Sequence, residues 1–486
     1  MKRNTEKLPS PWVSAIPLAV LTLLLYVVIR AFGGGAIDGG SQIALLSATS
    51  VCVMLSIGIY RCRWAVLEEA IIDNIRASAS AIVILLLIGA IAGTWMVSGV
   101  VPTMIYYGLQ ILHPSFFLVS SCVICAVVSL MTGSSWTTIA TIGVALMGIG
   151  QAMGFPEGWI AGAIISGAYF GDKLSLLSDT TVLASSTVGV PVFTHIRYML
   201  YTTVPSMLVA LGVFTVAGLS LEHGASTHAE MYAATLAATF RITPWLLVVP
   251  LATGILIARR LPAIVTLFCA AVFACAAMLL AQPETVARVA GVAELDFMSG
   301  FKGVLMTCFG PTAIPTGTLQ LDELVATRGM AGMLNTVWLI ICAMCFGGVM
   351  TGSGMLRSLT AIFLRWVRRT FSAVASTVGA GIFFNLCTAD QYISIILSGR
   401  LFRELYAERG LEPRLLSRSV EDSATVCSVL VPWNSCGMTQ ATVLGVSTFV
   451  YMPYCIFNIV SPLMSLMVAA IGWKIKRAAG TAAHPH

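Results

Sequence analysis

Two long segments of this 486-residue chain, residues 77–156 and residues 423–473, contain no Asp, Glu, Lys or Arg. In water, segments of this length would need charged side chains to cover their surface. A charge-free apolar run is stable where lipid is the solvent, and one crossing of the bilayer takes about 20 apolar residues. Each segment must therefore fold back across the bilayer, and the two together predict an all-α polytopic membrane protein.

The composition of the whole chain supports the same class. Hydrophobic residues make up 58% of the sequence, charged residues only 10%, and the mean hydropathy is +0.91. Soluble domains carry roughly 25% charged residues, so we exclude a soluble enzyme, a nucleic-acid-binding protein and a secreted disulfide scaffold. The 13 cysteines show no metal-binding spacing, and no cofactor is expected.

Apolar stretches of about 20 residues predict the simple spans. They lie at 12–30, 42–60, 79–98, 198–218, 244–258, 261–281, 333–356 and 456–473. Three longer stretches, 114–153, 159–190 and 374–447, are interrupted by small and polar residues. As one helix, residues 159–190 would measure about 48 Å, well beyond a hydrocarbon core of about 30 Å, so we expect a break at Gly171–Asp172. The pattern predicts about ten spans, two re-entrant hairpins and two discontinuous helices.

Clusters of Lys and Arg predict the orientation of the chain. These residues favour the cytoplasmic ends of spans, and the loops 31–41, 99–113, 219–230 and 282–298 are nearly free of them. We expect a multi-pass protein of the plasma (inner) membrane with both termini in the cytoplasm. The clusters are Lys2, Arg3 and Lys7; Arg61 and Arg63; Arg259 and Arg260; Arg365, Arg368 and Arg369; and Lys474, Lys476 and Arg477.

The chain also contains an internal repeat. A shift of 256 residues aligns Thr132, Gly143, Gly154, Gly189 and Val190 with Thr388, Gly399, Gly410, Gly445 and Val446. Residues 99–116 contain no Lys or Arg, whereas the equivalent residues 354–372 contain four Arg, which predicts opposite sides of the membrane. An inverted repeat is typical of secondary transporters that bind substrate near the bilayer midplane. We expect N-terminal spans with an interfacial helix (1–78), a first repeat (79–218), a linker with two spans (219–332), a second, inverted repeat (333–473) and a cytoplasmic tail (474–486). The interfacial helix is the amphipathic stretch 64–76, which would lead along the cytoplasmic surface into the third span.

The repeat predicts four polar breaks at membrane depth. Two are hairpin tips, at 132–138 and 388–392, and two are unwound helix centres, at 171–181 and 428–437. At such a break, backbone carbonyls lose their helical hydrogen bonds, and together with side-chain hydroxyls and carboxylates they suit a hard cation as ligands. The candidate cation- or proton-binding residues are Ser134, Ser135, Asp172, Ser178, Asp179, Thr180, Asp390, Asp422, Asn434 and Ser435. We expect Na⁺ at Asp172, Asp179 and Asp390, and Lys173 as a structural counter-ion.

The charge in and beside these breaks favours a cation as the ligand. Five carboxylates and one ammonium give a net charge of −4 when all are ionised. They belong to Asp172, Lys173, Asp179, Asp390, Glu421 and Asp422. Carboxylates at membrane depth usually serve ion or proton pathways. A carboxylate that takes a proton when the cation leaves would couple the two ions as an antiporter does. As alternatives, Asp172 and Asp179 cap the half-helices, and Glu421 and Asp422 pair with Arg418.

Several of these motifs resemble the NhaC family of Na⁺/H⁺ antiporters. They are residues 167–173 (GAYFGDK), 177–181 (LSDTT), 388–392 (TADQY), 421–423 (EDS) and 432–437 (PWNSCG). The resemblance spans roughly residues 75–473 and implies Na⁺/H⁺ exchange, with malate and lactate exchange in some relatives. The chain has Leu174, Leu176 and Val182 where the family pattern has Met, Pro and Asn, and Val182 removes an oxygen ligand beside Asp179.

Three other functions compete with a Na⁺/H⁺ antiporter. An organic-acid antiporter would need a basic residue in its site, and only Lys173 qualifies. An intramembrane aspartyl protease would use Asp in two helices, but the breaks are far richer in Ser and Thr than that chemistry requires. A passive cation channel would need no titrating carboxylate. The expected partners are the lipid bilayer and small cations, with a homodimer as the assembly to test.

Overall fold

The computed structural model of the chain describes residues 8–32, 39–221, 226–259, 261–317, 321–322, 325–365, 367 and 369–475. Within these residues helices are the only regular elements, besides an isolated β-bridge between Thr312 and Thr327. In the part of the chain that the structure describes, eight helices are long and apolar enough to cross a membrane, or up to 11 if each bent pair forms one span. The all-α polytopic class is confirmed. Lys2, Arg3, Lys7, Arg260, Arg368 and the tail 476–486 lie outside the described residues, so the predicted orientation of the termini is not tested.

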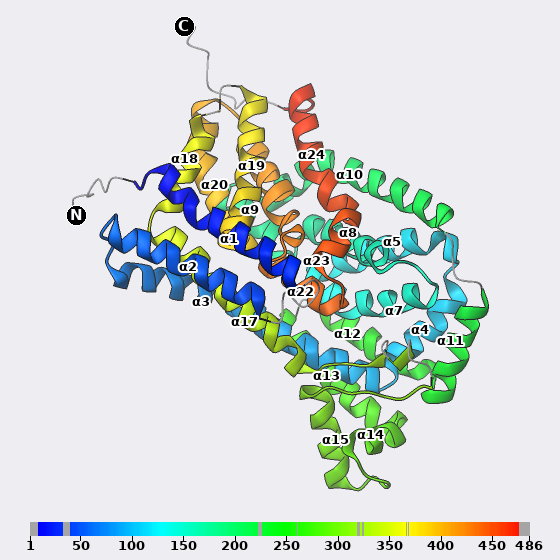
Figure 1. Cartoon of the computed structure of the whole chain (residues 1–486). Coiled ribbons are helices and arrows are strands. Elements are labelled where there is room, and N and C mark those ends of the chain that lie inside the picture. The colour runs from blue at the N-terminus through cyan, green and yellow to red at the C-terminus, as the bar shows by residue number, and fades with distance from the viewer. Residues whose placement is uncertain are drawn as a thin grey trace.

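Four long helices form one side of the molecule: α1 (Pro11–Phe32), α2 (Gly40–Gly58), α3 (Trp64–Val97) and α17 (Leu334–Gly352). They share a buried apolar cluster that includes Leu45, Leu85 and Phe346. Helix α3 has 34 residues and is about 51 Å long. The expected surface segment before residue 79 and the span that follows are therefore one continuous helix, whose first turns carry the charged residues. Figure 1 shows α1, α2, α3 and α17 side by side.

The first repeat continues with α4 (Val100–Ile111), α5 (Phe117–Thr132), α6 (Ser135–Thr138), α7 (Val144–Ala152), α8 (Glu157–Leu174), α9 (Asp179–Val188) and α10 (Val192–Ser220). Helices α5 and α8 pack closely because Gly167 and Gly171 have no side chain. A Cβ atom on Gly167 would lie 2.0 Å from the Cys122 carbonyl oxygen, and one on Gly171 would lie 2.2 Å from that of Ala126. The backbones of the two helices are thus in direct contact.

This contact predicts that Gly167→Ala destabilises the protein. The added methyl group meets a backbone oxygen that no rotamer change can move, and overpacking of this kind costs about 1–3 kcal/mol or more. Gly212→Ala on α10 is the matched control, since nothing lies within 4 Å of its Cβ position. Thermal unfolding in detergent should show a lower midpoint for Gly167→Ala and an unchanged or higher one for Gly212→Ala. Equal midpoints would contradict the packing described.

The second repeat continues after α17 with short and broken helices. They are α18 (Met355–Arg365), α19 (Thr370–Thr388), α20 (Gln391–Glu408), α21 (Pro413–Val420), the π-helical turn η6 (Glu421–Thr425), the 3₁₀ turn η7 (Ser428–Leu430), α22 (Ser435–Leu444), α23 (Thr448–Tyr451) and α24 (Ile456–Ile471). Helix α19 packs on α20 and on η6, and α24 packs on α10. The C-terminal helix thus packs directly against the first repeat.

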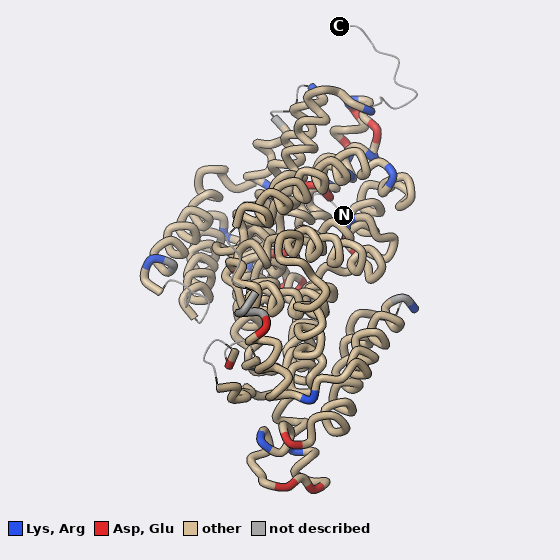
Figure 2. Tube along the Cα trace, turned by 90° about the vertical axis from the view of Figure 1, so that its right-hand side faces the viewer, with Lys and Arg blue, Asp and Glu red and all other residues tan. Residues whose placement is uncertain are grey.

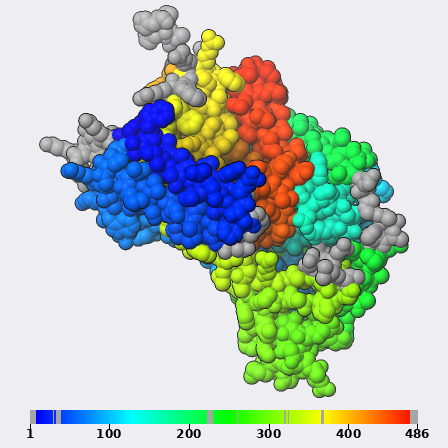
Figure 3. Space-filling view, in the orientation of Figure 1, coloured from blue at the N-terminus to red at the C-terminus, as the bar shows by residue number. Residues whose placement is uncertain are grey.

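The segment between the repeats forms α11 (Ser226–Thr239), α12 (Val248–Ala258), α13 (Ala263–Ala281), α14 (Pro283–Ala290) and α15 (Phe297–Phe309). Helix α13 packs on α3, while α14 and α15 project at the end of the molecule opposite α18 and α19 (Figure 1). In the space-filling view they form the green lobe at the bottom (Figure 3). Figure 2 shows charged residues in short groups at the top, the bottom and the side edges of the molecule, with others near its middle, and long helical stretches that carry none. The boundaries of the five predicted regions remain predictions.

Candidate functional site

The first hairpin tip is built by a left-handed glycine and a capping serine. Helix α5 ends at Thr132, and Gly133 follows with φ 68°. Ser134 then caps α6, because its Oγ accepts a hydrogen bond from the backbone N–H of Thr137 at 3.2 Å. A small residue with positive φ followed by Ser is the local signal that ends one helix and starts the next. The break falls inside the predicted tip at 132–138.

The first discontinuous helix breaks later than predicted. Helix α8 runs through Gly171 and Asp172 to Leu174, α9 begins at Asp179, and the two axes differ by 47°. The expected break at Gly171–Asp172 is therefore wrong by a few residues, because Gly171 serves the contact with α5 rather than a break. Ser178 caps α9: its Oγ lies 3.4 Å from the Thr181 N–H and 3.0 Å from the Thr180 hydroxyl.

A carboxylate joins this helix to the hairpin. The backbone N–H and the hydroxyl of Ser135 both donate to Oδ2 of Asp172, at 3.0 and 2.7 Å. Asp172 is 8% exposed. The structure thus brings Ser134, Ser135 and Asp172 together at one crossing of the hairpin with α8.

The second repeat places its carboxylate on the hairpin instead. Asp390 caps α20, because its Oδ1 accepts hydrogen bonds from the backbone N–H groups of Tyr392 and Ile393, at 2.9 and 3.1 Å. The Ser435 hydroxyl donates to the other oxygen of Asp390 at 3.2 Å, and the Ser435 N–H donates to the Ala389 carbonyl. Asn434 caps α22, accepting from the N–H of Cys436 at 3.0 Å. The structure therefore brings Asp390, Asn434 and Ser435 together.

Polar contacts of the first repeat recur in the second. Each pair is separated from its counterpart by 256 residues, the shift that the glycine matches predict. The left-handed positions Gly133 and Ala389 obey the same shift. The two breaks therefore share their local geometry, although the side of the membrane that each faces remains a prediction. The recurring pairs are Ser129–Ala168 and Asn385–Ala424, Thr132–Thr138 and Thr388–Ser394, Ser134–Thr138 and Asp390–Ser394, and Ser135–Asp172 and Gln391–Ser428.

The two halves meet at Asp179. The hydroxyl of Tyr392, at the second hairpin tip, donates to Oδ2 of Asp179 at 3.3 Å. Unlike Asp172 and Asp390, Asp179 is exposed. The described part of the chain contains no group of three or more His, Cys, Asp and Glu side chains that could share a metal ion. Asp172, Asp179 and Asp390 thus do not form one common cluster, so a cation here would take hydroxyl and carbonyl oxygens as its further ligands.

Lys173 of α8 and Asp422 of η6 form a buried ion pair. Both side chains are fully buried, and the Lys173 ammonium contacts Oδ1 of Asp422 and donates to the Ser461 hydroxyl at 3.1 Å. Thr202 donates to the same Asp422 oxygen at 3.1 Å, and the Arg418 Nε lies 3.9 Å from the other. Lys173 thus has a carboxylate partner in Asp422, and its role as a structural counter-ion stays a prediction. Asp422 pairs mainly with Lys173, and with Arg418 only at longer range.

Glu421 differs from its neighbour Asp422. It is fully buried, and neither carboxylate oxygen has a hydrogen-bond partner among the described residues; the same holds for the three guanidinium nitrogens of Arg418. The Arg418 guanidinium lies over the Tyr198 ring, 4.7 Å from its centroid. With Lys173 and Arg418 as cations and Glu421 and Asp422 as anions, the cluster is neutral when all four are ionised.

Sequence reasoning missed Thr202 and Ser461. Both lie in helices that read as ordinary apolar spans, α10 and α24, and both contact Asp422. A hydroxyl in the middle of a span is a weak signal by itself, since Ser and Thr often bond to their own helix backbone. Only the tertiary structure, in which α24 packs against η6 and α10 packs against α24 and α21, shows that these two hydroxyls reach the ion pair.

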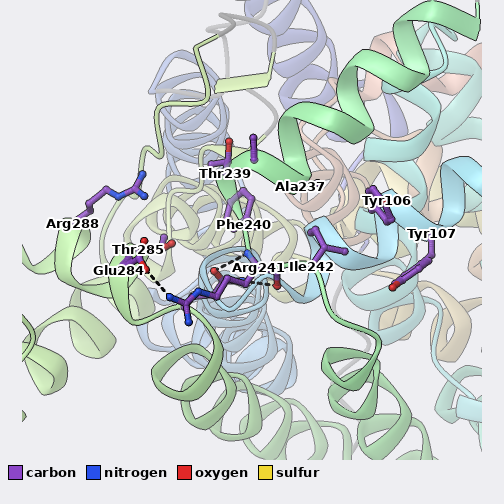
Figure 4. Close-up of a pocket in the computed structure, with 12 residues that line it drawn as sticks. Tyr106, Tyr107, Ala237, Thr239, Phe240, Arg241, Ile242, Glu284, Thr285 and Arg288 are labelled. Carbon is purple, nitrogen blue, oxygen red and sulfur yellow. Dashed lines mark hydrogen bonds and ion pairs between the residues drawn. The ribbon is translucent and has the colours of Figure 1, made fainter.

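A surface pocket of about 350 Å³ lies apart from these breaks. Tyr106 and Tyr107 of α4 line it, together with residues at the end of α11 and the start of α14. Figure 4 shows Arg241 reaching across to Glu284, to which it is bonded at 2.6 Å. Both side chains of this pair are more than half exposed, and none of the predicted site residues lines the pocket.

Comparison with known proteins assigns the family. The model of the Na⁺/H⁺ antiporter family matches residues 167–473, a range that holds both discontinuous helices and the second hairpin. Over 425 residues the chain is 36% identical to the Na(+)/H(+) antiporter NhaC of Alkalihalophilus pseudofirmus, covering 87% of this chain and 89% of that protein. The chain belongs to the Na⁺/H⁺ antiporter family. The resemblance to NhaC-type antiporters that the motifs predict is thereby confirmed.

Other relatives of the chain are named for other transported solutes. The chain is 33% identical to the malate-2H(+)/Na(+)-lactate antiporter of Bacillus subtilis, over 89% of both proteins. It is 32% identical to the arginine/ornithine antiporter ArcD of Halobacterium salinarum, over 97% of this chain and 94% of that protein. These three relatives are all antiporters, but their names give different solutes.

Proposed function

We propose that this protein is a secondary active transporter that exchanges cytoplasmic Na⁺ or Li⁺ for H⁺ by alternating access. The observation that carries the proposal is the pair of carboxylate-bearing breaks: Asp172 bonded to Ser135 in one repeat and Asp390 bonded to Ser435 in the other. Carboxylates surrounded by hydroxyls and freed carbonyls suit a small hard cation. Family membership supports the same solute.

Proton coupling follows from the chemistry of these carboxylates. A buried charge at membrane depth costs at least about 2.5–3.5 kcal/mol on insertion scales, so a carboxylate that loses its cation is best neutralised by a proton. Na⁺ and H⁺ then compete, and release of one ion on each side of the membrane drives uptake of the other. In this proposal the protein lies in the plasma (inner) membrane with both termini cytoplasmic, surrounded by lipid, and a homodimer is the assembly to test.

An organic-acid antiporter is the second candidate, favoured by the malate-2H(+)/Na(+)-lactate relative. A carboxylate substrate needs a cationic partner in the site, and Lys173 is the basic residue nearest the breaks in sequence. Its ammonium is fully buried and already paired with Asp422. This pairing favours Na⁺ over an organic acid as the solute.

Proton flux in proteoliposomes that enclose a pH dye tests the proposal. We expect pulses of Na⁺ or Li⁺ to move protons, and pulses of K⁺, malate, lactate or arginine to move none. Proton movement with malate or lactate alone would favour the second candidate. Absence of proton movement with Na⁺ and Li⁺ would refute the first, and Na⁺ flux without a fixed exchange ratio would indicate a channel.

A further inference from the structure

Helix α9 exposes one stripe of side chains although it lies next to the candidate site. Asp179, Val182 and Ser186 are exposed, and Val182 retains 42% of its accessible surface. Their spacing of three and four residues puts them on one face of the helix. The opposite face packs on α20, α21 and α10. The stripe begins at the break, where Asp179 meets Tyr392, and runs to the end of α9.

The equivalent helix of the second repeat exposes no such stripe. At the shift of 256 residues, Asp179 and Val182 correspond to Ser435 and Met438 on α22, which are 1% and 3% exposed. Ser186 corresponds to Thr442, which is half-buried and hydrogen-bonded to Thr336 of α17 at 2.6 Å. Since the two breaks share their local geometry, the difference lies in what covers them: α17, α3 and α7 pack against α22.

The exposed stripe suits water better than lipid. A carboxylate exposed to hydrocarbon would cost at least about 2.5–3.5 kcal/mol, and the exposed Asp179 lies at the inner end of the stripe, beside the break. The outer end, at the close of α9, is also near a charge. There the guanidinium of Arg403 lies 3.5 Å from the position that a Cβ atom on Gly189 would take. Arg400 and Arg403 are themselves exposed. Polar groups thus mark both ends of the stripe.

We propose that the Asp179–Val182–Ser186 stripe is one wall of an aqueous path from the cytoplasm to the break. The structure then represents a state that is open along α9 and closed along α22, with Tyr392 at the inner end of the path. In the state open to the other side, the repeat predicts that Ser435, Met438 and Thr442 are uncovered and that the Thr442–Thr336 hydrogen bond is broken. The assignment of this path to cation uptake rests on the proposed function; its accessibility does not.

Labelling of single added cysteines in the full-length protein tests the path. Val182→Cys and Ser186→Cys are compared with Met438→Cys and Thr442→Cys, their counterparts on α22, in open membrane fragments, where a membrane-impermeant maleimide reaches both faces of the membrane. Val272→Cys on α13 controls for lipid exposure, since Val272 is 47% exposed on an apolar helix and maleimide needs an ionised thiol. Labelling of the parent protein, which keeps its native cysteines, is subtracted.

We expect both α9 variants to react about tenfold or more faster than the α22 and α13 variants, since a minor conformer that opens the other side is populated at roughly 10% or less. Rates on α9 equal to that of Val272→Cys would mean that the stripe faces lipid. Equal rates on α9 and α22 would mean that neither side is preferentially open. Either result overturns the inference in a protein that still exchanges Na⁺ for H⁺, whereas loss of flux with the labelling pattern intact would refute only the proposed function.

Discussion

Replacing Asp422 with Asn is expected to destabilise the protein by about 3–5 kcal/mol, the usual cost of removing one partner from a buried ion pair. The Lys173 ammonium would lose its only ion-pair partner among the described residues, while its side chain stays fully buried. The cluster of Lys173, Arg418, Glu421 and Asp422 would change from neutral to +1. Thermal unfolding in detergent, monitored as the loss of monodisperse protein with rising temperature, measures the effect.

The double variant Lys173→Met/Asp422→Asn should recover most of this loss. It removes one charge of each sign, so the cluster is neutral again, and an apolar side chain replaces the buried ammonium. Glu284→Gln provides the surface control: its ion pair with Arg241 is exposed, and such pairs contribute at most about 1 kcal/mol. An Asp422→Asn variant as stable as the parent, or a double variant no better than the single one, would show that Lys173 and Asp422 do not stabilise each other.

Asp172→Asn and Asp390→Asn are each expected to weaken the apparent Na⁺ affinity about tenfold to a hundredfold, or about 1.4–2.8 kcal/mol. The change removes one negative charge but keeps the shape of the side chain. An Asn at 172 can still accept a hydrogen bond from Ser135. An Asn at 390 can still cap α20, because Asn is as good an N-cap residue as Asp. Na⁺-dependent proton flux in proteoliposomes measures the affinity.

The unfolding midpoint distinguishes lost binding from lost folding in these two variants. We expect it to change little, since the hydrogen bonds to Ser135, Tyr392 and Ile393 are retained. Asp73→Asn is the control, because Asp73 is exposed near the start of α3 and its ion-pair partner among the described residues is Arg76, three residues away. Unaltered Na⁺ dependence in both Asp172→Asn and Asp390→Asn would remove these carboxylates from the site and leave Asp179 as the remaining candidate.

Most of the local architecture can be predicted from the sequence. Gly133 followed by Ser134, Asp390 before α20 and Asn434 before α22 are capping signals that act within a few residues, and each lies at a break in the structure. The position of the first helix break is the exception. Gly171 looks like a helix breaker in the sequence, yet it lies inside α8, because its missing side chain is needed for the contact with α5.

The sequence by itself determined the membrane class, the two hairpin tips and the 256-residue shift, since these follow from hydropathy, capping and glycine positions that act over short ranges. Only the tertiary structure decided which charges meet. Lys173 and Asp422 are 249 residues apart in the chain, and Tyr392 reaches Asp179 across 213 residues. The exposure of α9 and the burial of α22 also come from the helices packed around them. Equivalent residues of a repeat carry the same local signals, and the helices that cover them determine which of the two water can reach.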